Sequence, residues 1–318
     1  MTETATIRIG ISACLLGHPV RYDGKHKRSP LCADTLGQHF QLIPICPEES
    51  IGLGTPRPPI HLVGEPASPR AVGVDNPSFD VTDALSSLGH RTAVQKKDIC
   101  GFILMQKSPS CGMQGVRVSA DDSHPADTTG AGIFAAALMQ ARPALPVEEE
   151  ARLADPVLLE NFISRVYVYA RWQQLQHEGL TRQRLIRFHQ RHKYLLMANH
   201  REQYQQLGRA VAQSASIPLA DFAPVYFNQL MQALKQPATR ASHCNVLQHL
   251  AGYLKRDLSA EQKQDLQELI TAYRTGTVPL SAPIALLKQH FSQHPDEYIA
   301  GQAYLQPHPQ EMGLYDSI

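Results

Sequence analysis

The sequence predicts two structural classes in one chain of 318 residues: an α/β N-terminal half on a mostly parallel sheet and an all-α C-terminal half. In the first half, short runs rich in β-branched residues alternate with segments of helical pattern, as in proteins built on parallel sheets. The second half has few strand signals, and its apolar residues recur at helical spacing. The run PALPVEEE at residues 143–150 marks the end of the first half. We therefore expect domains at residues 1–155 and 156–318.

Three strands are predicted in the N-terminal half, at residues 6–13 (TIRIGISA), 40–45 (FQLIPI) and 101–106 (GFILMQ). Helical patterns lie between and after them, at residues 29–37, 83–94 and 128–142. The segment 52–70 contains too many Pro and Gly residues for a regular element, so we expect an ordered loop there. This order of elements predicts a Rossmann-like domain whose strands run mostly parallel.

The C-terminal half shows apolar helix faces and helix starts. Apolar side chains recur at helical spacing at Val246, Leu247, Leu250 and Leu254. Residues 259–262 have the pattern of a capping box, and an apolar face follows at Leu266, Leu269, Ile270 and Tyr273. A further helix is predicted over residues 281–291, with Ser281 as its cap.

Composition is that of an ordinary globular protein. Hydrophobic residues at 43% can form real cores, and no apolar stretch approaches the roughly 20 residues needed to span a bilayer. Residues 1–10 lack the basic and apolar regions of a secretory signal, so we expect a cytoplasmic location without membrane association. None of the six cysteines forms a CxxC pair, which disfavours zinc-finger and thioredoxin-like sites.

Positive charge is concentrated in the C-terminal half, although the whole chain carries a net charge of only +1. Between residues 182 and 256, eleven Lys and Arg side chains stand against two acids, a local net charge of +9. Such a block is the electrostatic signature of a nucleic-acid contact. The alternative is a solvated helical surface whose arginines pair with acids elsewhere, such as Glu148, Glu149 and Glu150.

Cys14, Cys46 and Cys111 each follow the carboxyl end of a predicted strand. Because ligands of open parallel sheets bind in the crevice at those ends, we expect the three thiols to converge. Converging thiols can be buried packing residues, zinc ligands or ligands of an iron–sulfur cluster. A cluster held by three thiolates would keep one iron open, and that iron is a soft Lewis acid suited to a sulfur-bearing substrate.

Polar groups that fit catalysis lie in the same motifs. Glu48 follows Cys46 by two residues, and Ser108 and Ser110 bracket a proline beside Cys111. A carboxylate next to a metal can act as a general base on water. The simpler interpretation of Glu48 is a surface acid at a strand end.

Three N-terminal motifs together resemble the TudS thiouracil desulfidase family: SACLLGHPVRYDG at 12–24, CPEESIGLGTPRPP at 46–59 and KSPSCG at 107–112. The C-terminal half resembles the helical domain that is fused to TudS in the RudS proteins. The motifs that carry this second resemblance are RHKYLLMANH at 191–200, HCNVLQHLAGYLKR at 243–256, YRTGTVPL at 273–280 and YIAGQAYLQPHP at 298–309.

The resemblance implies a [4Fe–4S] cluster bound by Cys14, Cys46 and Cys111 with one iron open, and it matches the family's catalytic acid and serine to Glu48 and Ser108. RudS-like fusions are described as removing sulfur from 4-thiouridine in tRNA, with the helical domain helping to hold the tRNA. We therefore expect a non-redox, hydrolytic desulfuration at the open iron that returns 4-thiouridine to uridine. Glu48 would activate water, and Ser108 would position it or relay a proton.

Further residues are expected to contact the substrate. In the motifs of the N-terminal half, the candidates for contacts with base, ribose or phosphate are Arg21, Asp23, Arg57, Lys107 and Ser110. In the helical half, the candidates for contacts with tRNA are Arg182, Arg184, Arg187, Arg191, Lys193, Arg201, Lys255 and Arg256. Arg184, Arg187 and Arg191 would share one helix face.

Two alternative functions are considered beside this expectation. One keeps the chemistry but acts on free thiouracil or 4-thiouridine monophosphate, and the basic helical half disfavours it. The other is a cluster-containing RNA-binding or sensor protein without turnover, which Glu48 and Ser108 beside an open iron disfavour.

Overall fold

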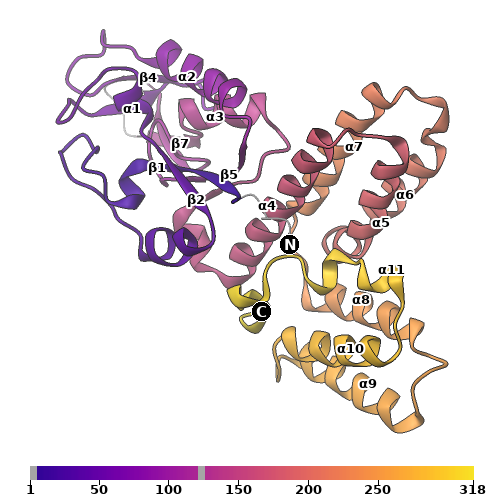
Figure 1. Cartoon of the computed structure of the whole chain (residues 1–318). Coiled ribbons are helices and arrows are strands. Elements are labelled where there is room, and N and C mark those ends of the chain that lie inside the picture. The colour runs from indigo at the N-terminus through magenta and orange to yellow at the C-terminus, as the bar shows by residue number, and fades with distance from the viewer. Residues whose placement is uncertain (1–5, 121–125) are drawn as a thin grey trace. The chain divides into compact units, whose positions relative to one another are not determined.

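The computed structural model describes residues 6–120 and 126–318, which form two compact units, Met1–Ala154 and Asp155–Ile318 (Figure 1). The division falls one residue before the predicted boundary. Residues 1–5, which begin the segment analysed for a secretory signal, lie outside the described residues. None of the helices in the described ranges is long and apolar enough to cross a bilayer.

The main sheet of the first unit consists of β1 (Arg8–Ser12), β2 (Gln41–Ile45), β5 (Ile99–Leu104) and β8 (Val147–Glu149). Its strand order is β2-β1-β5-β8, and every pair is parallel. Figure 1 shows β1, β2 and β5 close together in the first unit. The predicted α/β class with a parallel sheet is confirmed, and β5 is buried along its whole length.

Helices α2 (Thr82–Gln95) and α3 (Ile133–Ala141) pack closely against each other in the first unit. Gly89 permits this approach, because a Cβ atom there would lie 2.7 Å from both the Ala137 Cβ and the Phe134 carbonyl oxygen. The predicted helix at 83–94 is confirmed, because α2 spans these residues. The predicted helix at 29–37 is irregular, with a π-helical segment at Leu31–Thr35 and a 3-10 turn at Leu36–Gln38.

A second sheet was not predicted. It contains β3 (Ile60–Val63), β4 (Arg70–Gly73), β6 (Val116–Ser119) and β7 (Ala126–Gly130), in the order β4-β3-β6-β7. The prediction of a loop over 52–70 is therefore wrong at β3, and the prediction that a helix begins at 128 is wrong because β7 continues to Gly130. These strands are short, and distant partners stabilise them, including an apolar cluster that contains Leu62, Leu85 and Val118.

The second unit is helical: α4 (Pro156–His177), α5 (Arg182–Asn199), α6 (Arg201–Gln213), α7 (Leu219–Leu234), α8 (Arg240–Tyr253), α9 (Ala260–Thr275), α10 (Ser281–Gln293) and α11 (Glu297–Ala300). Residues 155–318 are all described, and no strand occurs among them. The predicted capping box is present, because the Ser259 hydroxyl accepts from the Gln262 N–H and the Gln262 side chain accepts from the Ser259 N–H. The predicted cap at Ser281 is wrong, since Leu280 takes that position and makes no side-chain cap.

The helical core has the composition that periodicity predicted. Val246, Leu247, Leu250 and Leu254 are all buried on α8 or just after it. In another part of the core, the ring of Trp172 stacks on Phe227 with 4.5 Å between ring centres.

Candidate functional site

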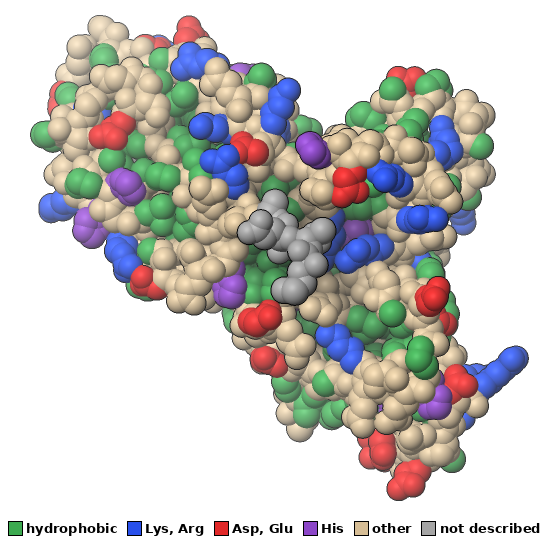
Figure 2. Space-filling model, in the orientation of Figure 1, with side chains coloured by type: hydrophobic (Ala, Val, Ile, Leu, Met, Phe, Trp, Pro, Cys, Tyr) green, Lys and Arg blue, Asp and Glu red, His purple; other side chains and the backbone are tan. Residues whose placement is uncertain are grey.

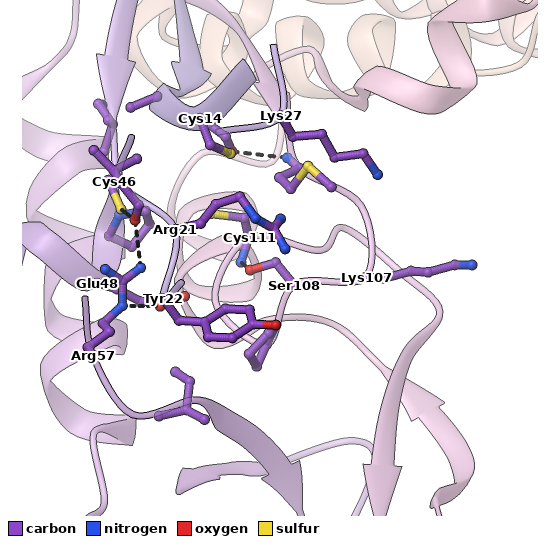
Figure 3. A pocket seen from close by; sticks show the side chains of 18 of the residues that line it. Cys14, Arg21, Tyr22, Lys27, Cys46, Glu48, Arg57, Lys107, Ser108 and Cys111 are labelled. Carbon is purple, nitrogen blue, oxygen red and sulfur yellow. Dashed lines mark hydrogen bonds and ion pairs between the residues drawn. The ribbon is translucent and has the colours of Figure 1, made fainter. Parts of the chain in front are cut away.

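Three cysteines line one cavity of about 460 Å³ at the carboxyl ends of β1, β2 and β5 (Figure 3). Cys14 lies in a 3-10 turn, Ala13–Leu16, directly after β1. Cys46 follows β2 and is the N-cap residue of the short helix α1 (Pro47–Ser50). Cys111 lies in the turn after β5 and is buried. Because these strands are adjacent and parallel, their following loops emerge at the same edge of the sheet.

Burial and mutual repulsion oppose ionisation of the three thiols. Burial raises the pKa of Cys14, and the neighbouring Cys46 raises it further. Burial also raises the pKa of Cys46. At Cys111 burial raises the pKa strongly, with smaller contributions in the same direction from Glu48, Cys46 and Cys14. The three sulfurs are therefore close enough to interact, and they can ionise together only beside a compensating cation.

The donor set fits a cationic sulfur-bound group that is larger than a single ion. Within the described ranges, no three Cys, His, Asp or Glu side chains are arranged to hold one metal ion. Figure 3 shows the three sulfur atoms distributed around the cavity instead. Thiolates are the usual ligands of iron–sulfur clusters, which need wider spacing than one ion.

The other three cysteines do not line the cavity. Cys32 lies in the π-helical segment, and burial raises its pKa to about 11. Cys100 was expected to precede its strand but is its second residue, at the amino end of β5 and away from the edge where the cavity lies. Cys244 is buried on α8 in the other unit. All three behave as small buried hydrophobic residues.

Glu48 extends from α1 into the cavity, and both of its carboxylate oxygens accept hydrogen bonds. The Arg57 Nε donates to Oε2 over 2.7 Å, and the Ser110 hydroxyl donates to Oε1 over 2.8 Å. Each carboxylate oxygen has a second lone pair, so Glu48 can still accept a proton or a water hydrogen bond. The interpretation of Glu48 as a surface acid is not supported, because its side chain is only 14% exposed.

Arg57 lines the cavity and also holds the loops of the site together. Its side chain is 4% exposed. Besides Glu48, its guanidinium donates to the carbonyl oxygens of Gly54 and Val20 over 2.8 Å and to the Thr55 hydroxyl over 3.2 Å. Four of the five guanidinium N–H groups are therefore used within the protein. Arg57 was predicted to contact the substrate; it lines the cavity, and its hydrogen bonds also give it a positioning role.

The turn that carries Cys111 is built around the Ser108 hydroxyl. Its oxygen accepts hydrogen bonds from the Cys111 N–H over 3.0 Å and from the Ser110 N–H over 3.3 Å. Lys107 enters the turn with φ 57°, in the left-handed region that is costly for a residue with a Cβ. Because both contacts use the oxygen as acceptor, the Ser108 O–H proton remains available to a group in the cavity.

The remaining predicted substrate contacts divide into two groups. Arg21 and Lys107 line the cavity, whereas Asp23 and Ser110 do not. Asp23 accepts from the Lys25 N–H outside the cavity, and Ser110 is fully buried behind Glu48.

Tyr22, Lys27 and Gln106 also line the cavity and were not predicted from the sequence. The available signal for two of them was the run RYDGKHK at residues 21–27, which combines an aromatic ring with several cations.

Of the eight candidate RNA contacts on the helical unit, some bind backbone carbonyl oxygens and others are exposed. Arg182 donates to the carbonyl oxygens of Ser214 and Ile217, and Arg184 donates to those of Glu178 and Gly179. These two arginines therefore support local structure. Exposed basic side chains are found at Arg187, Arg191, Arg201, Lys255 and Arg256. Figure 2 shows Lys and Arg side chains gathered over the part of this unit that contains α5 and α6.

Two of the three acids that were considered as alternative partners of these arginines, Glu148 and Glu149, have partners in their own unit. Glu148 accepts a hydrogen bond from the Arg152 Nε over 2.7 Å, and Glu149 accepts one from the Met113 N–H over 2.9 Å. Both carboxylates are buried. This arrangement favours a solvent-facing basic surface over an internal ion-pair network.

Replacing Arg57 by Lys tests its role in holding the loops. Lys keeps the charge, but a single ammonium group cannot reach acceptors on three sides. We expect the free energy of unfolding to fall by about 1–3 kcal/mol, the usual cost of buried polar groups that lose their partners. Anaerobic denaturant unfolding followed by circular dichroism measures this change.

Arg21→Lys is the matched control, because Arg21 lines the same cavity with weaker contacts, a 3.7 Å ion pair to Asp23 and a cation–π contact with the Tyr22 ring. Its effect should stay within about 0.5 kcal/mol, as for most partly exposed substitutions. Equal stability of the Arg57→Lys variant and the wild type would show that the Arg57 hydrogen bonds are not needed to hold the loops.

Comparisons with known proteins bear on both units. A family model described as 2-thiouracil desulfurase matches residues 9–150, and a model described as a protein of unknown function (DUF1722) matches residues 193–309. The uncharacterized protein YbgA of Escherichia coli (strain K12) is 31% identical over 159 residues, which are 50% of this chain and 94% of YbgA. The uncharacterized protein YbbK of Bacillus subtilis (strain 168) is 30% identical over 137 residues, 41% of this chain and 89% of YbbK.

A solved structure of a [4Fe-4S]-dependent thiouracil desulfidase, TudS, is 34% identical to this chain. The match covers 47% of this chain and 94% of that protein, with a TM-score of 0.37.

Proposed function

We propose that this chain, which belongs to the 2-thiouracil desulfurase family of enzymes and carries a DUF1722 domain, removes sulfur from 4-thiouridine in tRNA and leaves uridine. The observation that carries the proposal is the cavity in which Cys14, Cys46 and Cys111 meet Glu48 and Ser108. The reaction is a hydrolysis: water supplies the new carbonyl oxygen at C4, and the sulfur leaves as hydrogen sulfide. No electron donor is required.

The cysteines fit a [4Fe–4S] cluster with one open iron, which when bound would supply a soft Lewis acid for the thiocarbonyl sulfur. Burial raises the pKa of all three thiols, and neighbouring thiols raise those of Cys14 and Cys111 further, which favours a site that ionises only with such a cationic group.

Glu48 acts as the general base in this proposal. Arg57 and Ser110 fix both carboxylate oxygens from behind, so the carboxylate has a defined orientation before substrate enters. A water molecule between Glu48 and C4 loses its proton to the carboxylate as it attacks.

Ser108 acts as a hydrogen-bond donor in this proposal. Two backbone N–H groups hold its oxygen, so the hydroxyl proton can be directed to the attacking water or to the leaving sulfur. The strained backbone at Lys107 orients this turn. Ser108 and Glu48 thus provide a donor and an acceptor on the same cavity wall.

Two features support a nucleotide within RNA as the substrate. A cavity of about 460 Å³ is within the usual range for small-molecule sites and suits one nucleoside, which must leave its stack to enter. The helical unit carries the exposed cations of the +9 block, which suit a polyanion. Free thiouracil or 4-thiouridine monophosphate would also fit the cavity but would not need that surface.

The ligand assignment predicts which cysteines are needed for the cluster. Anaerobically purified protein should be brown, with iron and sulfide in equal amounts, and Cys14→Ala, Cys46→Ala and Cys111→Ala should each lose the cluster because one of three thiolates is removed. Cys32→Ala, Cys100→Ala and Cys244→Ala are the controls and should retain it. Iron analysis and the visible absorption spectrum measure the result, and a full cluster in Cys111→Ala would refute the assignment.

The proposed reaction is tested by 4-thiouridine content in thiolated tRNA, and in parallel in 4-thiouridine monophosphate, after anaerobic incubation with cluster-loaded protein. The wild type should desulfurate the tRNA. Glu48→Gln and Ser108→Ala should keep the cluster and lose activity, by about 10²–10⁴-fold for loss of the base.

Ser110→Ala, which removes only one hydrogen bond to Glu48, should be less impaired than Glu48→Gln. Turnover of the free nucleotide alone would favour the salvage alternative. A stable cluster without turnover of either substrate would favour the sensor alternative.

The basic surface predicts a salt-dependent affinity for tRNA. Replacing Arg187 and Arg191 together by Ala should weaken binding and flatten the dependence of affinity on salt, because fewer condensed counterions are released. Arg182→Ala is the control, since its guanidinium is bound to backbone carbonyls. Fluorescence anisotropy across a salt series measures both quantities. Unchanged affinity and slope in the double variant would exclude this face as the RNA contact.

A further inference from the structure

A cluster of three tyrosines and one lysine lies on the helical unit, in a different unit from the cavity with the cysteines. The Lys193 ammonium lies 4.7 Å from the ring centre of Tyr194 and 4.7 Å from that of Tyr298. The Tyr298 and Tyr253 ring centres are 6.1 Å apart, with 31° between the ring planes. The cluster joins α5, the end of α8 and α11, which are far apart in sequence.

The cluster presents one exposed ring on a fixed support. Tyr194 is buried, whereas Tyr253 is 42% exposed. The Tyr194 hydroxyl donates to the Tyr253 hydroxyl over 3.2 Å, so the outer ring is held at its tip as well as by the Tyr298 ring. A single exposed aromatic residue needs no explanation, but a ring braced from two directions loses little conformational entropy when a flat ligand stacks on it.

Both cations and acids adjoin the residues of this cluster, so the local net charge is small. Lys255 and Arg256 lie two and three residues after Tyr253 and are exposed, and Lys193 lies within the cluster. Two exposed acids, Asp257 and Glu297, adjoin the same residues in sequence. The cations can contact a phosphate next to a stacked base, while the near balance of charge means that stacking must provide most of the binding.

We propose that Tyr253, braced by Tyr194 and Tyr298, stacks on one unpaired base of an RNA bound to the helical unit. This inference rests on the proposed function, because it names how the helical unit recognises an RNA substrate. Proteins recognise single-stranded regions and loops of RNA by stacking unpaired bases on aromatic rings, which the edges of a paired duplex do not permit. The arginines Arg187 and Arg191 on α5, the helix that also provides Lys193 and Tyr194, supply phosphate contacts.

The experiment uses the full-length chain and a short single-stranded RNA without thiolated bases that carries 2-aminopurine, whose fluorescence falls when it stacks. Wild-type protein should quench the probe on binding. Tyr253→Ala should bind with an affinity about 5- to 150-fold lower, the usual effect of losing one stacked base, and should quench less. The slope of affinity against salt should stay at the wild-type value, unlike that of the Arg187 and Arg191 variant.

Two control variants separate stacking from packing. Tyr253→Phe keeps the ring and loses the bond to Tyr194, so it should retain affinity and quenching. Phe79→Ala removes a ring of similar exposure, 37%, from the other unit and should bind RNA as the wild type does. Equal affinity and quenching in Tyr253→Ala and wild type would overturn the proposal, and so would a loss in Tyr253→Phe as large as that in Tyr253→Ala.

The outcomes for stacking and for desulfuration are independent, because the RNA probe contains no sulfur. A chain that binds through Tyr253 but does not turn over thiolated tRNA would support the stacking site and refute the proposed reaction. A chain that desulfurates tRNA while Tyr253→Ala binds normally would support the reaction and refute the stacking site.

Discussion

The parallel pairing of β1 with β2 on one side and with β5 on the other is the constraint on which the cavity depends. Ser12 of β1 is in register with Ile45 of β2, and Ile11 is in register with Ile103 of β5. The chain therefore leaves all three strands at one level and in one direction. Loops that are far apart in sequence meet there, and each brings one cysteine.

Arg57 converts these loops into a site with a defined shape. The segment between Cys46 and Ile60 has few backbone hydrogen bonds of the kind that join strands. The buried Arg57 guanidinium donates hydrogen bonds to Glu48 and Gly54 within this segment and to Val20 outside it. A buried charge costs desolvation energy, which is offset when most of its N–H groups find acceptors. The same residue thus orders the loops and holds the carboxylate that the proposed reaction needs.

The cavity of the proposed reaction and the exposed basic side chains lie in different units of the chain. The first unit has a small polar cavity where position is decided by individual hydrogen bonds, which salt affects little. The second has an excess of exposed cations, whose attraction for a polyanion acts over a Debye length of about 8–10 Å and weakens with salt. The proposed stacking on Tyr253 would add a contact of a third kind, which depends on ring area and is insensitive to salt.

The sequence by itself determined the features that depend on neighbouring residues. Apolar periodicity identified the face of α8, and the capping box at Ser259 located the start of α9, because both are set within a few residues. Strand ends could be placed from β-branched runs, so the positions of Cys14, Cys46 and Cys111 at one sheet edge could be predicted from a parallel topology.

Only the tertiary structure decided which distant groups become partners. The strand β3 is too short and too close to prolines to be recognised alone, and it exists because β4 and β6 pair with it. Arg57, Arg182 and Arg184 looked like ligand contacts in the sequence, yet carbonyl oxygens and Glu48 take their donors. The partner of a long, flexible side chain depends on which backbone passes within its reach, and local sequence carries no information about that. For the same reason, Lys193, Tyr253 and Tyr298 became a cluster only when α5, α8 and α11 packed together.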